Sequence, residues 1–369
     1  MNISGRSDKD TERLLQILVE IMTKTNLSTL NLEEINELIK PLGASSFRAR
    51  QIFNWVYLKS AKSIDEMTDL SKKFRDELNE IATITTSTIK RKQTSKDGTI
   101  KYLIEYADGE CVETVLMRFD NRANLTACVS SQVGCSVNCA FCATGKRGFI
   151  RNLTPAEIVE QVLTIQRDTG LKVTNIVFMG QGEPLLNLKN VLEAIDFINT
   201  NLVISQRRIT VSTSGIAPKI RELADKQLQI TLALSLHAPN SNIRRTLMQI
   251  DNKYPMDEVK KALKYYNEVT GRRITIEYLL IKNVNDRIEH AKEVAEFLHD
   301  IKCNVNLIPY NPVDETGFKR PSNNDIMKFK CILEHSGKKV TIRLERGADI
   351  DAACGQLRGK VVWKDLSKE

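Results

Sequence analysis

From about residue 125 to residue 344, strand-length apolar segments alternate with segments that are long enough to form helices. The apolar segments are rich in Val, Ile, Leu and Thr, which favour strands, and lie at 126–131, 174–179, 208–213, 229–235, 273–281, 303–309 and 339–344. Helical periodicity marks segments between them, for example 155–168, 187–199, 256–268, 287–300 and 323–335. Because parallel strands need crossovers of this length, the pattern predicts parallel βαβ units in an α/β fold, as an open or closed barrel.

Three cysteines directly follow the first of these strands and give the strongest chemical signal. Cys135, Cys139 and Cys142 have the spacing CxxxCxxC. A cubane iron–sulfur cluster normally has four thiolate ligands, so a loop with three would leave one iron open to another ligand. An open coordination position is typical of a reactive site rather than a structural one.

A zinc knuckle and an electron-carrying ferredoxin are the competing interpretations of this loop. Structural zinc needs four ligands, and the four histidines of the chain lie far away in sequence, at His237, His290, His299 and His335. A ferredoxin needs a fourth cysteine nearby. The spacing therefore favours an iron–sulfur cluster over both alternatives.

Polar residues recur at the ends of later strands, where ligands bind in α/β folds. The first case is the sequence MGQGEP, in which Gly182 lets backbone approach a ligand and Glu183 can accept from an ammonium group. Ser212, the run Ser235, Leu236 and His237, and Asn311 follow at other strand ends. Each signal is weak alone, because such residues often serve only as loop hydrogen-bonding groups. Their recurrence predicts a ligand site.

The remaining cysteines are Cys111, Cys128, Cys303, Cys331 and Cys354. A lone cysteine in an α/β protein is usually a small buried apolar residue. That explanation suits Cys111, Cys303 and Cys331, which fall in strand or helix patterns, and it suits Cys354 less well. Cys354 lies in a glycine-containing loop after the last strand, where a thiolate could face the barrel mouth.

The first 120 residues lack the alternation of strands and helices that the rest of the chain shows. Residues 1–29 are a charged extension, and 30–82 have a helical pattern with many basic residues. These helices are interpreted either as a bundle with solvated basic faces or as an accessory domain that binds RNA. Residues 83–120 are expected to be a linker followed by a β-hairpin, with its turn at Asp108 and Gly109, and 121–369 to be the barrel.

Composition sets limits on the class of protein. The formal net charge of +8 permits a polyanionic partner without demanding one. No apolar run approaches the roughly 20 residues that cross a bilayer, and the N-terminus has no apolar signal-peptide core. We therefore expect no membrane association and a cytoplasmic location, in which the eight cysteines stay reduced.

The cysteine loop, with Phe141 before its third cysteine and an α/β barrel after it, resembles the radical S-adenosylmethionine (SAM) superfamily. More of the chain, from about 30 to 358, resembles the dual-specificity adenine-C2 RNA methyltransferases of that superfamily. The segments that carry this resemblance are Phe47 to Trp55, Val112 to Val115, the sequence GEPLLN, and the specific DIDAACGQL near the C-terminus. The resemblance implies a partial (β/α) barrel with a small N-terminal helical domain.

The resemblance also implies residue roles. Cys135, Cys139 and Cys142 would hold a [4Fe–4S] cluster, and SAM would contact Gly182, Glu183, Ser212, Ser235, Leu236, His237 and Asn311. Cys354 would be the methyl carrier, Cys128 the second catalytic cysteine and Glu113 the proton acceptor. Two SAM molecules would be used per turnover, because one methylates Cys354 and the other is cleaved to a 5′-deoxyadenosyl radical.

The implied partners are 23S rRNA, tRNA and an external electron donor such as a flavodoxin-type reductant. Two alternatives stay open at this point. One is an enzyme that methylates the C8 carbon of the same ribosomal adenosine and confers antibiotic resistance. The other is a non-enzymatic RNA-binding protein with a metal cluster or zinc.

Overall fold

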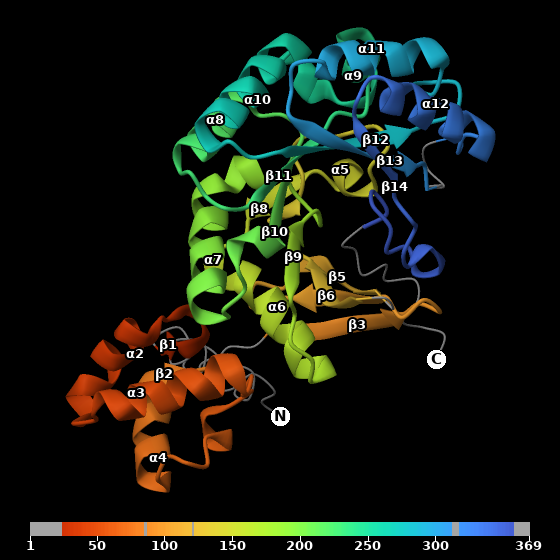
Figure 1. The fold of residues 1–369 in the computed structure, drawn as a ribbon. Helices are drawn as coiled ribbons and strands as arrows, with labels where there is room; N and C mark the ends of the chain where they lie inside the picture. Colours follow the sequence, from red (N-terminus) through yellow and green to blue (C-terminus); the bar gives the residue numbers. More distant parts are fainter. Residues whose placement is uncertain (1–23, 85–86, 120–121, 312–316, 358–369) are drawn as a thin grey trace, which may run out of the picture. The chain divides into compact units, whose positions relative to one another are not determined.

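A ten-stranded sheet forms the frame of the larger part of the molecule (Figure 1). The computed structural model describes residues 24–84, 87–119, 122–311 and 317–357. The chain divides into two compact units, residues 1–86 with 166–170 and residues 87–165 with 171–369. The sheet belongs to the second unit, in the order β14-β13-β12-β11-β10-β9-β6-β5-β4-β3.

Seven strands of this sheet run parallel, as the alternating pattern predicted. They are β6 (Arg122–Cys128), β9 (Asn175–Phe178), β10 (Ile209–Thr213), β11 (Thr231–Ser235), β12 (Ile274–Leu280), β13 (Cys303–Pro309) and β14 (Lys339–Ile342). Their apolar side chains are buried, for example throughout β12. The predicted α/β class and the partial barrel are confirmed.

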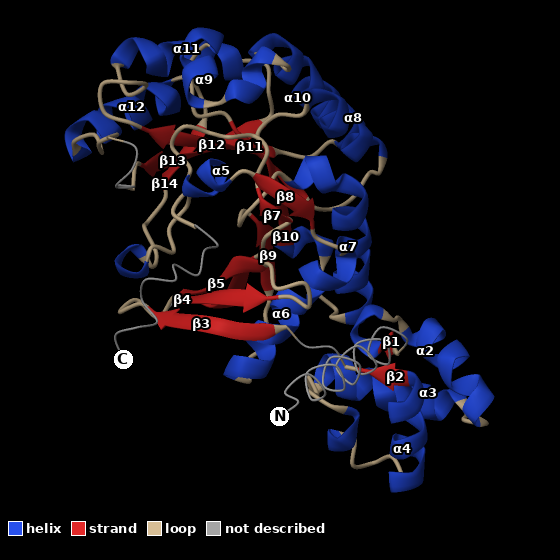
Figure 2. Ribbon diagram, turned by 180° about the vertical axis from the view of Figure 1, so that it is seen from behind, coloured by secondary structure: helices blue, strands red, loops and turns tan. Residues whose placement is uncertain are grey.

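Helices connect the parallel strands and cover the outer face of the curved sheet (Figure 2). They are α6 (Pro155–Thr169), α7 (Leu188–Asn201), α8 (Ala217–Asp225), α9 (Ser241–Leu247), α10 (Met256–Thr270), α11 (Ile288–Leu298) and α12 (Asn323–His335). The start of α6 is fixed by a reciprocal cap. Glu157 N donates to Thr154 Oγ1 over 3.2 Å, and Thr154 N donates to a Glu157 carboxylate oxygen over 2.8 Å.

The expected linker is wrong for residues 88–94, which form β3 (Thr88–Thr94). This strand pairs antiparallel with β4 (Ile100–Glu105), and β4 pairs with β5 (Cys111–Phe119), which pairs with β6. The predicted hairpin is therefore part of the main sheet. Lysine and arginine made β3 look like a linker, but exposed basic residues are typical of an edge strand because they discourage pairing with other chains.

The first unit is helical in its described part. It contains α2 (Leu32–Ile39), α3 (Ser46–Phe53) and α4 (Lys72–Ile81), with the two-residue strands β1 (Thr25–Asn26) and β2 (Ala82–Thr83). Asn31 caps α2 through a capping box with Glu34. Residues 1–23 of the expected extension lie outside the described residues, and the predicted domain boundaries stay predictions. No helix in the described part of the chain is long and apolar enough to cross a membrane.

A small second hairpin positions the cysteine loop. It consists of β7 (Gln132–Gly134) and β8 (Phe149–Asn152), with the short helix α5 (Ala143–Arg147) between them. Gly134 has φ +75°, and a Cβ atom there would lie 1.8 Å from the backbone oxygen of Gly148. Only glycine fits this position, so the hairpin depends on it.

We expect Gly134→Ala to lower the free energy of unfolding by about 2–5 kcal/mol, the sum of left-handed backbone strain and overpacking. Gly271→Ala is the matched control, because Gly271 has φ +66° with nothing within 4 Å of its added Cβ. That control should lose only about 1–2 kcal/mol. Urea unfolding of both variants measures the difference, and equal losses would contradict the role of the close contact.

Candidate active site

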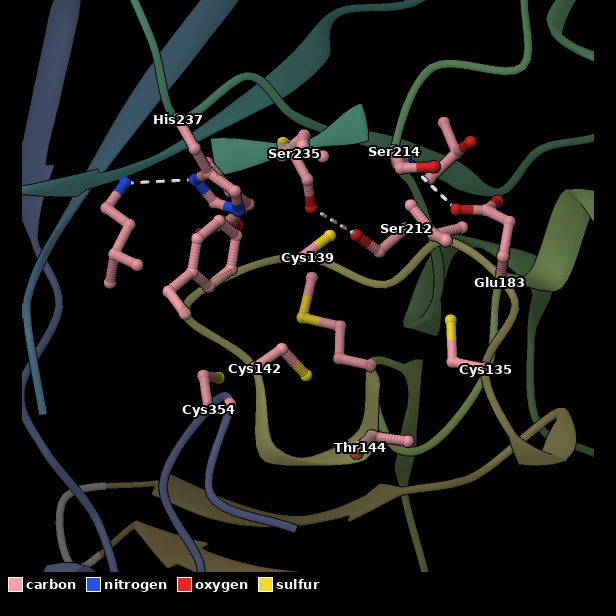
Figure 3. A pocket seen from close by; sticks show the side chains of 18 of the residues that line it. Cys135, Cys139, Cys142, Thr144, Glu183, Ser212, Ser214, Ser235, His237 and Cys354 are labelled. Carbon is pink, nitrogen blue, oxygen red and sulfur yellow. Dashed lines mark hydrogen bonds between the residues drawn. The ribbon is translucent and has the colours of Figure 1, made fainter. Parts of the chain in front are cut away.

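One cavity lies at the carboxyl ends of the parallel strands and is lined by most of the predicted site residues (Figure 3). We call it the first cavity. The predicted residues that line it are Cys135, Cys139, Cys142, Gly182, Glu183, Ser212, Ser235, His237 and Cys354. They come from the cysteine loop (residues 135–142), from the segments that follow β9, β10 and β11, and from the C-terminal segment. The fold thus gathers residues that lie up to about two hundred positions apart.

The backbone holds the cysteine loop in place on three sides. Cys135 N donates to Gly148 O over 2.9 Å, and Ala140 N donates to Leu247 O over the same distance. At Gly145 of α5, a Cβ atom would lie 3.0 Å from the Cys139 nitrogen. The three thiol groups therefore face the cavity from a loop that the protein itself orders.

Cys135 and Cys139 need a positive partner to ionise. Burial raises the pKa of Cys135 to about 12 and raises that of Cys139 well above its usual value, with neighbouring thiols adding to both effects. Among the described residues, no three His, Cys, Asp or Glu side chains converge as the ligands of a single metal ion do. A cubane cluster instead takes one thiolate at each iron, so donors arranged around a cavity fit it.

The turn after β9 places Glu183 in the same cavity. At Gly182 the added Cβ atom would lie 2.6 Å from Gln132 Cβ, and φ is +98°, so only glycine allows this turn. The Glu183 carboxylate accepts hydrogen bonds from Ser214 N over 2.7 Å and from Leu185 N over 3.0 Å. Burial still raises the pKa of Glu183. The carboxylate is thus oriented by backbone groups at the cavity wall.

Hydroxyl and imidazole groups also line the first cavity. Ser212 Oγ lies 3.4 Å from Ser235 Oγ. His237 has φ +54°, and its Nδ1 accepts from Leu279 N over 3.0 Å. Burial and the nearby Arg244 lower the His237 pKa to about 3. The neutral ring therefore carries its proton on Nε2, where it can donate a hydrogen bond.

Two predicted SAM contacts lie elsewhere. The Leu236 side chain is fully buried and lies outside the residues that line the first cavity, and Leu236 N donates to Glu277 O over 3.0 Å. Asn311 lines an adjoining second cavity, and its buried Oδ1 has no hydrogen-bond partner in the described structure. A buried amide oxygen without a partner is a rare arrangement that suits a ligand.

Cys128 and Cys354 both line this second cavity. Burial raises the pKa of Cys128 to about 12, and the nearby Cys354 contributes. Cys354 also lines the first cavity, together with Met179, Ile308, Arg343 and Leu357. Electrostatic interaction with Cys354, followed by those with Glu277 and Cys128, raises the pKa of Arg343 despite burial. The two cavities therefore meet at Cys354.

Glu113 lines neither cavity. It lies on β5 two and four positions before Val115 and Met117, which line the second cavity, so it shares their face of the sheet. Its carboxylate forms an ion pair with Lys101 Nζ at 3.3 Å. The structure thus brings Glu113 to the same face as Cys128 but leaves it at the margin of the cavity.

Sequence reasoning missed Arg244, Glu277 and Arg343. Arg244 is fully buried and donates to backbone oxygens of Ser214 over 2.5 Å and Leu236 over 3.2 Å. It also pairs with the buried Asp251 at 3.1 Å. Nothing in the local sequence distinguishes this arginine from its exposed neighbour Arg245. Glu277 offered a signal, because a lone carboxylate inside the apolar run ITIEYLLI is unusual.

Family models match both units of the chain. The Radical SAM superfamily matches residues 129–298, and the Ribosomal RNA large subunit methyltransferase N-terminal domain matches residues 25–84. A probable dual-specificity RNA methyltransferase RlmN from Alkaliphilus oremlandii is 48% identical over 92% of this chain and 99% of its own length. A relative of the same name from Bacillus velezensis is 48% identical over 91% of this chain and 93% of its own.

A solved structure is also similar. The radical SAM methyltransferase from Sphaerobacter thermophilus has a TM-score of 0.86 and 44% identity, and the alignment covers 91% of this chain and all of that one. The similarity extends across both the accessory unit and the barrel, because so little of either chain is left unaligned.

We expect Cys139→Ala to abolish binding of the iron–sulfur cluster, because the loop then offers two thiolates in place of three. Iron and sulfide analysis after anaerobic reconstitution, with visible absorption spectra, measures the loss. Cys331→Ala is the control, since Cys331 is exposed on α12 and should leave the iron content unchanged. Wild-type iron content in Cys139→Ala would remove Cys139 from the ligand set.

Proposed function

Because the chain belongs to the RlmN family of radical SAM RNA methyltransferases, we propose that it methylates the C2 carbon of adenosine in 23S rRNA and in tRNA. The chain is a transferase enzyme, and its superfamily uses a [4Fe–4S] cluster and SAM. The proposal further includes two SAM molecules per turnover, a cytoplasmic place of action and an external electron donor such as a flavodoxin-type reductant.

The position of Cys354 carries the proposal. Among the described cysteines it alone borders both cavities, with Cys135, Cys139 and Cys142 on one side and Cys128 on the other. A methyl group carried on this sulfur would face the SAM site and the substrate site at once. That arrangement supports a carrier between two reactants that occupy neighbouring cavities.

The first cavity supplies groups of the right chemistry for SAM. We assign Glu183 to the SAM ammonium group, and Ser212, Ser235 and the His237 Nε2–H to its polar oxygens, with backbone of Gly182 and Leu236 beside them. The cysteine loop would hold the cluster, which when bound supplies the electron that cleaves SAM. Apolar side chains of Phe141, Met248, Leu279 and Ile308 also line this cavity and limit the access of water.

The second cavity supplies the groups that act on the substrate. The target adenine must be unstacked from its neighbouring bases to enter this cavity, which costs roughly a few kcal/mol of free energy. We assign the unpartnered Asn311 Oδ1, which the sequence predicted as a SAM contact, to a polar contact at this cavity, and Glu113, at its margin, to the removal of the C2 proton. We assign Cys128 to the attack on the Cys354 sulfur. This attack forms an S–S bond and breaks the bond from the Cys354 sulfur to the transferred carbon, which keeps the electron pair, takes up a proton and becomes the methyl group of the product. The released enzyme then contains a Cys128–Cys354 disulfide, which the electron donor must reduce.

We also propose that residues 30–82 bind RNA backbone. The basic residues of this segment include Arg48, Arg50, Lys59, Lys62, Lys72, Lys73 and Arg75. Lys59 Nζ lies 3.6 Å from the ring centre of Trp55, which fixes one cation beside an aromatic surface. Basic and aromatic groups together suit a nucleic acid whose phosphates and bases must both be held.

Product analysis tests the proposed function. Reconstituted protein is incubated anaerobically with SAM, a low-potential reductant and either a 23S rRNA fragment or tRNA, and the digested nucleosides are separated beside authentic standards. We expect 2-methyladenosine from both RNAs, because the adenine C2 must lie against Cys354. The appearance of 8-methyladenosine, or of no methyladenosine, would refute the assignment. Chromatographic separation is needed because the two isomers have equal masses.

We expect Cys354→Ala to form no methyladenosine while it keeps the iron and sulfide content of the wild type, because Cys354 lies outside the cysteine loop. The measurement is the same nucleoside assay with iron analysis on the same sample. Cys331→Ala again serves as the control and should retain activity. Turnover by Cys354→Ala would exclude Cys354 as the methyl carrier.

A further inference from the structure

Lys101 is a buried cation near the start of β4, whose other residues are apolar except for the terminal Glu105. All but the last residue of β4 are buried, and the Lys101 side chain is 9% exposed. Lysine is rarely buried unless its ammonium group has partners. In the sheet register Lys101 pairs with Val115, a residue that lines the second cavity, so Lys101 lies on the cavity side of the sheet.

Its ammonium group joins two parts of the proposed site. Lys101 Nζ lies 3.3 Å from Glu113 Oε1 and donates to the backbone oxygen of Asp351 over 3.1 Å. The Glu113 side chain is 10% exposed. Asp351 lies three residues before Cys354. One buried cation therefore connects the proposed proton acceptor with the loop that carries the proposed methyl carrier.

The same hairpin anchors that loop at a second place. In the turn between β3 and β4, Ser95 Oγ donates to Asp349 Oδ1 over 2.5 Å and Lys96 N donates to Asp349 Oδ2 over 3.2 Å. In return, Gly347 N donates to Asp97 Oδ2 over 3.0 Å. The hairpin thus fixes where the Cys354 loop begins, and Lys101 fixes it nearer to the cysteine.

The backbone of Glu113 is fixed from the other side. Ser130 Oγ donates to Glu113 O over 2.7 Å and accepts from Gln181 N over 2.9 Å, and Val115 pairs with Cys128 in the sheet. Hydrogen bonds and sheet pairing therefore hold the main chain of Glu113 close to Cys128. The ion pair with Lys101 adds a contact at the end of the side chain, on the side of the Cys354 loop.

We propose that Lys101 is a positioning residue, which holds the Glu113 carboxylate at a fixed place relative to Cys354. The proposal rests on the proposed function, because it needs Glu113 to accept the C2 proton. A proton acceptor must lie within hydrogen-bond reach of the proton that it takes. Without Lys101, the binding and cleavage of SAM should proceed as before, whereas the later removal of the proton should slow down.

The test compares Lys101→Met with Lys101→Arg, Glu113→Gln and the double variant Lys101→Met with Glu113→Gln. Lys90→Met is the matched control, because Lys90 forms a 3.1 Å ion pair with Glu105 on the same hairpin but with both partners more exposed. The assays measure 2-methyladenosine formation, SAM cleavage, the KM for SAM and covalent protein–RNA adducts on denaturing gels. Iron content and urea unfolding are measured in parallel.

We expect Lys101→Met to slow methyladenosine formation by about 10-fold to 100-fold, because a misplaced base loses part of the roughly 100-fold or more that it contributes. SAM cleavage in the first turnover and the KM for SAM should stay at wild-type values, and substrate RNA should accumulate as an adduct on Cys354. Lys101→Arg should recover part of the rate because it keeps the charge. The double variant should be no slower than Glu113→Gln, because both changes affect one interaction.

Wild-type product formation in Lys101→Met would overturn the proposal. The proposal would also be wrong if the rate loss of the double variant equalled the product of the two single losses. It would be wrong, too, if Lys101→Met lost iron or folding stability, Lys90→Met lost neither, and that loss accounted for the slower product formation. A wild-type protein that forms no 2-methyladenosine from either RNA would instead show that the proposed function has failed.

Discussion

Contact between the Cys354 loop and α5, which directly follows the cysteine loop, is the constraint on which the rest of the site depends. Ala143 N donates to Gly355 O over 2.8 Å, and Thr144 Oγ1 donates to Leu357 O over 2.7 Å. These bonds join the start of α5 to the residues that flank Cys354, a link across more than 200 positions of the chain. Without it, the first cavity would lose one wall and Cys354 would no longer border both cavities.

Charge is confined within this enclosed space, where burial strengthens each electrostatic interaction. Glu277 illustrates the effect: burial raises its pKa, Asn306 Nδ2 donates to one carboxylate oxygen over 3.0 Å, and the other oxygen has no hydrogen-bond partner in the described structure. Arg343 interacts electrostatically with both this carboxyl group and Cys354, since each of them raises the pKa of Arg343. A permanent cation at that point stabilises the ionised form of either group, which a neutral side chain could not do.

The sequence predicted features that depend on a local pattern of residues and missed features that depend on contacts between distant segments. The parallel strands and the spacing of Cys135, Cys139 and Cys142 were readable because periodicity and ligand spacing are local properties. The edge strand β3 was not, since its exposed lysines resemble those of a linker. Arg244 and Lys101 were missed because burial of a basic residue results from contacts with distant segments. Asn311 was found by its strand-end position, but its placement in the second cavity needed the fold.

The arrangement of the cysteines follows from what each set must do. Ligands of one cluster have to be fixed relative to each other, so a single short loop held by the backbone suffices for Cys135, Cys139 and Cys142. Cys128 and Cys354 must instead meet a substrate that enters between them, so they need independent supports. The sheet register fixes Cys128 opposite Val115, whereas the Cys354 loop is held by side chains of the β3–β4 hairpin and by the start of α5. Because Cys128 and Cys354 lie in distant segments of the chain with separate supports, their thiols can line one cavity from different walls.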